Sequence, residues 1–362
     1  MRRMLFVLMA TIGFATTAHC QAPPAGTTAI TFQSSIYSDI RQVLARQAAT
    51  GTVTIRASLR FPEQVRDRYP AIIVVHTIAG YRDVNEGYAA AELRKSGFAT
   101  LTYDSFAARK TTGMAMSGSP AYLPAGVVDA YAALRRLANE PRIDANRIAI
   151  LGFSFGAEVA HMTAFESLRS ALSPDQVRFA AHVAFYPAGN FGVIAEHGAY
   201  TGSPVLMLLG EKDDNLPVAK IESYLAYARG AAAPIENVIY PGAYHAWTVP
   251  DLVTARFYPE FVSTKKCPLI LLGQTGRRFS STVRQSHSTK MCSALACATL
   301  PDTRWGLMQP FARNRSLMRC GFCSEISSRS ARLQGIEIGL MHDLRSVAFL
   351  MPGAKLPSTP MS

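Results

Sequence analysis

Cysteine is missing from a long central part of this 362-residue chain, because none occurs between Gln21 and Val262. Disulfide bonds and cysteine-ligated metal sites are therefore excluded from that part. A chain of this size can bury enough apolar surface to fold without disulfides, and 49% of its residues are hydrophobic. The cysteine-free part can therefore form a sizeable core by itself.

Net charge is also scarce in most of the chain, although the whole sequence carries a formal +12. Residues 264–362 contain 14 Lys and Arg against 4 Asp and Glu, whereas residues 1–263 contain 23 against 21. The basic charge thus belongs to the C-terminal part. Because a nucleic-acid site needs a basic surface, no nucleic-acid partner is expected for the near-neutral remainder.

Long hydrophobic runs are absent except for one near the N-terminus, at residues 4–15. It is too short for a membrane span, so no stable span is expected. Two arginines precede the run and small residues lie just ahead of Gln21, which is the pattern of a secretory signal peptide over residues 1–20. We therefore expect an exported protein, periplasmic or extracellular. A lipid anchor on Cys20 is the less favoured alternative, because His19 fits a lipoprotein signal poorly.

Short apolar runs and helical patterns alternate through the cysteine-free part. The predicted strands are residues 52–59, 71–75, 98–103, 148–151, 179–185, 205–209 and 238–240, and the predicted helices are residues 88–96, 125–138 and 218–232. This alternation predicts an α/β fold with a mostly parallel sheet covered by helices on both faces. We expect one domain over residues 28–262, with a Gly-, Ser- and Pro-rich loop at residues 104–123. Residues 264–279 still fit a continuation of this domain.

The most specific motif is Gly152-Phe153-Ser154-Phe155-Gly156, which lies between a predicted strand and a helix-forming stretch. This context is typical of the G-x-S-x-G nucleophile elbow. The tight turn lifts the Ser154 hydroxyl above the sheet and aims the Phe155 backbone N–H at an oxyanion. Ser154 is therefore the candidate nucleophile, and the alternative is an incidental serine in a glycine-rich turn.

A serine hydroxyl needs an adjacent base, and the base needs an orienting acid. In folds with this elbow, the acid and then the histidine follow the serine, each on a loop after a strand. Asp213 and Asp214 follow one predicted strand, and His245 follows the next. Either aspartate can be the acid at this stage, and Asp214 also fits a helix N-cap. His161 is expected to pack in the core, and His197 follows no predicted strand.

The oxyanion needs a second backbone N–H, which this architecture takes from the loop after the strand at residues 71–75. Ile78 is the best candidate and Thr77 is the next. An ordinary turn at the end of a strand is the alternative interpretation.

Five stretches within residues 52–261 are distinctive when taken together, namely His76-Thr-Ile-Ala-Gly80, Asp104-Ser-Phe-Ala-Ala-Arg109, Gly152-Phe-Ser-Phe-Gly156, Gly210-Glu-Lys-Asp213 with Pro217, and Tyr240-Pro-Gly-Ala-Tyr-His245. On these stretches, the region resembles the dienelactone hydrolase-like branch of the α/β-hydrolases. The resemblance implies an α/β-hydrolase fold and a triad of Ser154 as nucleophile, Asp213 as acid and His245 as base. It implies hydrolysis of a small-molecule ester or lactone through an acyl-serine intermediate, with no metal or organic cofactor.

The chain also departs from that family. Dienelactone hydrolases proper use a cysteine nucleophile and a glutamate in the oxyanion loop, where this chain has Ser154 and Thr77. They hold the substrate carboxylate with arginines, and Arg109 is the candidate for that role here. These departures favour a serine esterase. A peptidase or acyltransferase on the same triad, or a non-catalytic binding protein that keeps the fold, are the alternatives.

The composition changes at about Ser280 to Ser, Arg, Cys and Met without apolar periodicity. The Cys320-Gly-Phe-Cys323 pair has no second pair to complete a metal site. The codons of residues 299–312 can be read out of frame as GYSMGFDAA, which resembles a stretch that some family members carry before their last helix. We hypothesise that residues 280–362 are an out-of-frame tail that does not fold with the domain. A genuine extension is the alternative, and DNA sequencing across codon 280 distinguishes the two.

Overall fold

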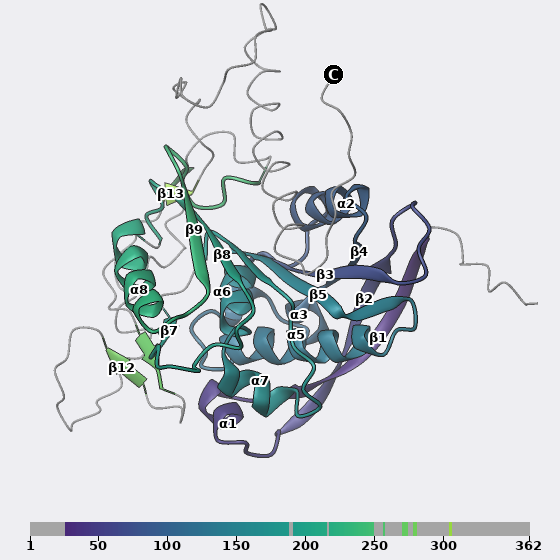
Figure 1. The fold of residues 1–362 in the computed structure, drawn as a ribbon, viewed down its shortest axis with the longest axis horizontal. Helices are drawn as coiled ribbons and strands as arrows, with labels where there is room; N and C mark the ends of the chain where they lie inside the picture. The colour runs from purple at the N-terminus through teal and green to yellow at the C-terminus, as the bar shows by residue number, and fades with distance from the viewer. Residues whose placement is uncertain are drawn as a thin grey trace, which may run out of the picture.

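The computed structural model describes residues 26–187, 191–215, 217–249, 256–257, 270–273, 278–280 and 304–305. Eight strands form its central sheet: β1 (Thr27–Ile36), β2 (Gly51–Arg60), β3 (Tyr69–Val75), β4 (Ala99–Tyr103), β5 (Ile143–Phe153), β6 (His182–Phe185), β8 (Val205–Gly210) and β9 (Ile235–Tyr240). Their order across the sheet is β1-β2-β4-β3-β5-β6-β8-β9 (Figure 1). Only β2 runs against the other strands of this sheet. The predicted α/β fold with a mostly parallel sheet is confirmed.

Helices connect the strands and cover both faces of the sheet. They are α1 (Ile40–Leu44), the π-helical turn η1 (Asp83–Gly87), α2 (Tyr88–Lys95), α3 (Ser105–Ala108), α4 (Gly113–Met116), α5 (Tyr122–Ala138), α6 (Phe155–Met162), α7 (Glu166–Leu172) and α8 (Val218–Gly230). Every strand and helix predicted above overlaps one of these elements. The sequence patterns did not predict β1, which pairs with β2 along its whole length.

The core lies in two layers, because successive side chains of a strand point to opposite faces. On β3, Ile73 and Val75 join the layer formed with α5 and α6, whereas Ile72 and Val74 join the layer formed with α2. All four side chains are fully buried. Figure 1 shows α2 on one side of the sheet and α5 and α7 on the other. None of the helices within the described residues is long and apolar enough to cross a membrane.

Residues 104–123 differ from the expected loop, because they contain the short helices α3 and α4. Each helix begins at a side-chain cap. The Asp104 carboxylate accepts the backbone N–H groups of Phe106 and Ala107, and the Thr112 hydroxyl accepts that of Ala115. One capped turn is too short to produce an apolar periodicity, which is why the sequence pattern predicted a loop.

The folded unit extends beyond residue 262, where the domain was expected to end. Strand β11 (Ile270–Leu272) pairs parallel with β7 (Phe191–Val193) and antiparallel with β12 (Arg278–Ser280). Leu272 is buried in the main core, and its carbonyl accepts the Ile194 N–H at 2.9 Å. Burial of this leucine explains why the fold continues past the predicted boundary.

The expected signal peptide, residues 1–20, lies outside the described residues. The same is true of the C-terminal tail after Ser280, apart from β13 (Arg304–Trp305), which pairs with β10 (Arg256–Phe257). Because β13 pairs with β10, these two tail residues contact a part of the chain that lies inside the predicted domain. A tail wholly separate from the fold would not make this contact. The out-of-frame hypothesis for the other tail residues stays a prediction.

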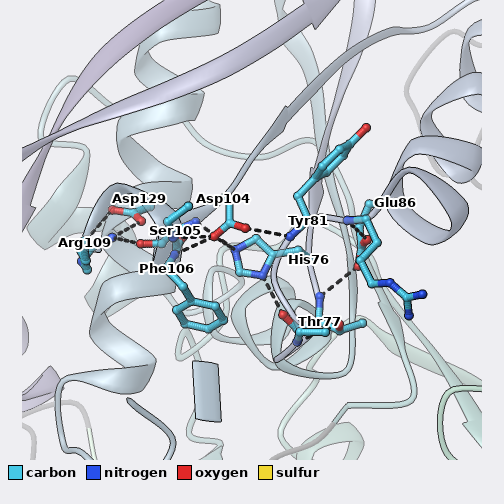
Figure 2. A network of polar contacts seen from close by, with 12 residues as sticks. His76, Thr77, Tyr81, Glu86, Asp104, Ser105, Phe106, Arg109 and Asp129 are labelled. Carbon is cyan, nitrogen blue, oxygen red and sulfur yellow. Dashed lines mark hydrogen bonds and ion pairs between the residues drawn. The ribbon is translucent and has the colours of Figure 1, made fainter. Parts of the chain in front are cut away.

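Arg109 lies in a buried ion pair. Its Nη1 and Nη2 atoms are 2.7 and 2.8 Å from the two carboxylate oxygens of Asp129 on α5, and Nη1 also donates to the Ser105 carbonyl at 2.8 Å (Figure 2). Asp129 is fully buried and accepts a further hydrogen bond from Ser34 on β1. The structure therefore shows a structural role for Arg109, and the predicted substrate contact stays a prediction. Nothing in the short motif around Arg109 points to a partner on another helix.

Because the Arg109–Asp129 pair is buried, removing one partner leaves an uncompensated charge. Arg109→Met should lower the free energy of unfolding by about 3–5 kcal/mol, measured by urea denaturation. The double variant Arg109→Met/Asp129→Leu should recover much of that loss, because no buried charge remains. If Arg109→Met left the free energy of unfolding unchanged and raised KM, the results would instead favour a contact between Arg109 and the substrate.

Candidate active site

The elbow at Ser154 has a backbone conformation that residues other than glycine rarely adopt. Strand β5 ends at Phe153 and α6 begins at Phe155, and Ser154 between them has φ 53° and ψ −109°. Its N–H donates to the Phe185 carbonyl on β6 at 2.9 Å. A side chain at Gly152 would lie 2.0 Å from the carbonyl oxygen of Gly156. The strained turn therefore needs glycine on both sides of the serine.

The predicted triad residues lie together in one hydrogen-bonded chain. The Ser154 Oγ is 2.9 Å from His245 Nε2, and His245 Nδ1 is 2.8 Å from Asp213 Oδ2. Ser154 and His245 are fully buried, and Asp213 is 6% exposed. Asp213 follows β8 and His245 follows β9, so both lie at the carboxyl ends of parallel strands. Of the two aspartates, the structure brings Asp213 to the histidine.

Further contacts hold the acid and the imidazole in place. The second carboxylate oxygen of Asp213 accepts the Asn215 N–H at 2.8 Å. The ring of Tyr186 lies edge-on to that of His245, with their centroids 5.1 Å apart. The Tyr186 hydroxyl hydrogen-bonds to Thr248, and burial raises the pKa of this phenol, which stays neutral. Sequence reasoning missed Tyr186, although its place just after β6 is a signal.

Thr77 and Ile78, the two candidates for the second oxyanion donor, differ in whether their backbone N–H is already hydrogen-bonded. The Thr77 N–H donates to the carboxylate of Glu86 at 3.0 Å, so it is already engaged. The Ile78 N–H has no hydrogen-bond partner among the described residues. Phe155 is the first residue of α6, where a helical N–H has no partner within its own helix. Of the two candidates in the loop after β3, Ile78 is therefore the one whose N–H is available.

The other histidines have different surroundings. His161 is buried among Phe165, Tyr200 and Tyr224, and burial lowers its pKa to about 3. It is neutral at ordinary pH, and its expected packing role is confirmed. His197 is exposed. No group of three or more His, Cys, Asp or Glu side chains in the described part of the chain could hold a metal ion.

The hydrogen bond from His245 to Asp213 gives a direct kinetic prediction. Asp213→Asn should lower kcat by about 10⁴-fold, because an amide neither fixes the imidazole tautomer nor stabilises the imidazolium. Asp214→Asn is the matched control and should retain nearly full kcat. A larger loss for the control, measured on the same ester, would move the triad acid to Asp214.

Comparison with known proteins identifies a family for this chain. Residues 55–256, more than half of the chain, match the model of the dienelactone hydrolase family. No curated protein matches the sequence.

Similar solved structures include a putative dienelactone hydrolase from Klebsiella pneumoniae, which is 21% identical (61% of this chain, 89% of that chain, TM-score 0.43). Another is a dienelactone hydrolase-like promiscuous phosphotriesterase from metagenomic libraries, which is 19% identical (62% and 86%, TM-score 0.46). A third is a thermophilic esterase from Thermogutta terrifontis, which is 17% identical (54% and 81%, TM-score 0.43). On the strength of the family match, the chain belongs to the dienelactone hydrolase family and is a carboxylic ester hydrolase with the α/β-hydrolase fold.

Proposed function

We propose that this protein is a serine esterase that hydrolyses a small carboxylic ester or lactone through an acyl-serine intermediate. The observation that carries the proposal is the continuous hydrogen-bond chain from Asp213 through His245 to Ser154. A hydroxyl that donates to an oriented imidazole is the arrangement that makes serine nucleophilic near neutral pH.

In the acylation half of the reaction, the Ser154 oxygen attacks the ester carbonyl while His245 Nε2 takes its proton. Asp213 accepts the Nδ1–H and stabilises the imidazolium that forms. The N–H groups of Phe155 and Ile78 donate to the oxyanion of the tetrahedral intermediate. The imidazolium then protonates the leaving alkoxide, and the alcohol departs.

In the deacylation half, a water molecule attacks the acyl carbon, and His245 takes its proton. The second tetrahedral intermediate collapses and releases the carboxylic acid, while the Ser154 oxygen recovers its proton from the imidazolium. No group beyond the triad, the oxyanion donors and water is needed for this sequence. The match to the dienelactone hydrolase family favours a compact ester or lactone over a polypeptide.

The first test is removal of the nucleophile. Ser154→Ala should lower kcat on p-nitrophenyl butyrate and on a γ-lactone by about 10⁴-fold or more, with little change in Tm. His245→Asn should give a comparable loss, and His197→Asn, at an exposed histidine, is its matched control. A fluorophosphonate should label the wild-type protein and leave Ser154→Ala unlabelled.

Other outcomes would contradict the esterase proposal. Labelling of Ser154 without turnover of any ester or lactone, but with cleavage of peptides, would favour a peptidase. Transfer of the acyl group to an added alcohol in preference to water would favour an acyltransferase. Absence of both labelling and turnover would favour a binding protein that keeps the fold.

We also propose that the protein is exported, because its first 20 residues have the pattern of a signal peptide. The protein produced in a bacterial host from the full coding sequence should appear in the periplasm or medium with Gln21 as its first residue. Recovery from the cytoplasm with the leader intact would contradict export, and attachment to membranes through Cys20 would favour the lipid anchor.

A further inference from the structure

In the loop that follows β3, nearly every backbone N–H donates a hydrogen bond to a neighbouring group. Figure 2 shows this loop with His76, Glu86 and Asp104 around it. Of the five consecutive N–H groups from Thr77 to Tyr81, four have acceptors: Glu86 Oε1 for Thr77, Thr77 Oγ1 for Ala79, the Thr77 carbonyl for Gly80, and Asp104 Oδ2 for Tyr81. The fifth, from Ile78, has none among the described residues. The loop therefore leaves one donor available, and it is the expected oxyanion donor.

His76 holds the peptide unit to which that donor belongs. Its ring is fully buried at the end of β3. The Ser105 backbone N–H donates to His76 Nε2 at 2.9 Å, so this nitrogen carries no proton. The proton of the neutral ring therefore lies on Nδ1, which is 2.7 Å from the Thr77 carbonyl oxygen and donates to it. Ser105 thus fixes the tautomer, and His76 fixes the carbonyl.

The direction of the Ile78 N–H follows from that of the Thr77 carbonyl. Both groups belong to one planar peptide unit, in which a trans bond points the C=O and N–H in opposite directions. The carbonyl accepts from His76 and also from the Gly80 N–H at 3.1 Å. A rotation of this peptide that moved the Ile78 donor would have to break both hydrogen bonds.

His76 also lies against the elbow that carries the nucleophile. Its ring stacks on that of Phe155, with centroids 5.8 Å apart and planes 28° from parallel. Helix α6 approaches so closely that a side chain at Gly156 would meet the Val75 and His76 carbonyl oxygens at 2.3 and 2.8 Å. One imidazole thus contacts the residue of one expected oxyanion donor and orients the peptide of the other.

We propose that His76, as an Nδ1-protonated imidazole, is a positioning residue that holds the Ile78 N–H in the oxyanion hole. The inference rests on the proposed esterase function, since an oxyanion forms only if Ser154 attacks a carbonyl. In this inference, a buried histidine outside the triad lowers the activation barrier by positioning an oxyanion donor. It does not take part in proton transfer.

Three substitutions separate the two hydrogen bonds of the ring. His76→Asn places an amide donor near the Nδ1 position, so it keeps the bond to the Thr77 carbonyl and loses the acceptor for Ser105. His76→Gln reaches the Nε2 position, so it keeps the acceptor and loses the donor. His76→Phe keeps a ring and loses both. The Gln and Phe variants should lose about 10²–10³-fold in kcat, as loss of one oxyanion donor does, whereas Asn should stay within about tenfold of wild type.

The measurements distinguish positioning from general support of the fold. Each variant is assayed on p-nitrophenyl butyrate for kcat and KM, and by thermal unfolding for Tm. Inhibition by phenylboronic acid, which forms a tetrahedral adduct on serine, should weaken in the Gln and Phe variants while KM changes little. His161→Asn, at another buried histidine, is the control and should lower Tm without lowering kcat. Equal losses of kcat in the Asn and Gln variants, or wild-type kcat in the Phe variant, would overturn the inference.

A fourth variant tests the inference without altering the imidazole. Ser105 is the first residue of α3, where proline is well tolerated. Ser105→Pro removes the N–H that His76 Nε2 accepts, together with a buried hydroxyl that has no hydrogen-bond partner among the described residues. It should lower kcat several-fold at nearly unchanged Tm, because the tautomer is no longer fixed. Wild-type kcat in this variant would overturn the tautomer assignment. If the wild-type protein shows neither ester turnover nor reaction with phenylboronic acid, the esterase proposal itself fails, which is a different result from any of the above.

Discussion

The whole site depends on how closely helix α6 approaches the ends of β3 and β5. Side chains at Gly152 and Gly156 would meet backbone atoms at 2.0 and 2.3 Å, so only glycine permits this approach. The approach forces Ser154 into a backbone conformation with positive φ, and the strain of such a residue persists only where its surroundings over-determine it. Here the buried strand and helix on either side supply that constraint and lift the hydroxyl towards His245.

Hydrogen bonds connect the loop after β3 with the loop that carries His245. In the first of these loops, the Thr77 N–H donates to the fully buried Glu86 carboxylate, which also accepts the Arg82 N–H and the side-chain amide of Asn85. Asn85 in turn accepts the Thr248 hydroxyl at 3.1 Å.

Thr248 also hydrogen-bonds to Tyr186, whose ring packs against His245. The loop that presents Ile78 and the loop that presents His245 are therefore parts of one network. Because a buried carboxylate without partners is costly, the donors to Glu86 keep this network in one arrangement.

The hydrogen-bonded arrangement of Ser154, His245 and Asp213 and most of the sheet were predictable from the sequence because both depend on local patterns. Continuous apolar runs such as β3 indicate buried parallel strands, and G-x-S-x-G between a strand and a helix specifies the elbow. The order of Asp213 and His245 along the chain then limits the candidates. The first two of these signals lie within a few residues of the side chains that they identify.

The features that escaped prediction depend on contacts between distant residues. Within its own motif, Arg109 resembles a substrate-binding arginine. Only the fold shows that its guanidinium forms an ion pair with the carboxylate of Asp129. The packing of Leu272 in the core, ten residues past the expected boundary, depends on its pairing with β7. His76 follows an ordinary apolar strand, and only the fold shows that the Ser105 N–H donates to its ring.

The most direct test of this account is to trap the acyl-enzyme. The wild-type protein is mixed with p-nitrophenyl acetate, quenched with acid during turnover, digested, and analysed by mass spectrometry. The account predicts an acetyl group on the peptide that contains Ser154, and a stoichiometric burst of p-nitrophenol before the steady state. Hydrolysis without any acetylated Ser154 peptide and without a burst, also in the slowed Asp213→Asn variant, would contradict catalysis through an acyl-serine.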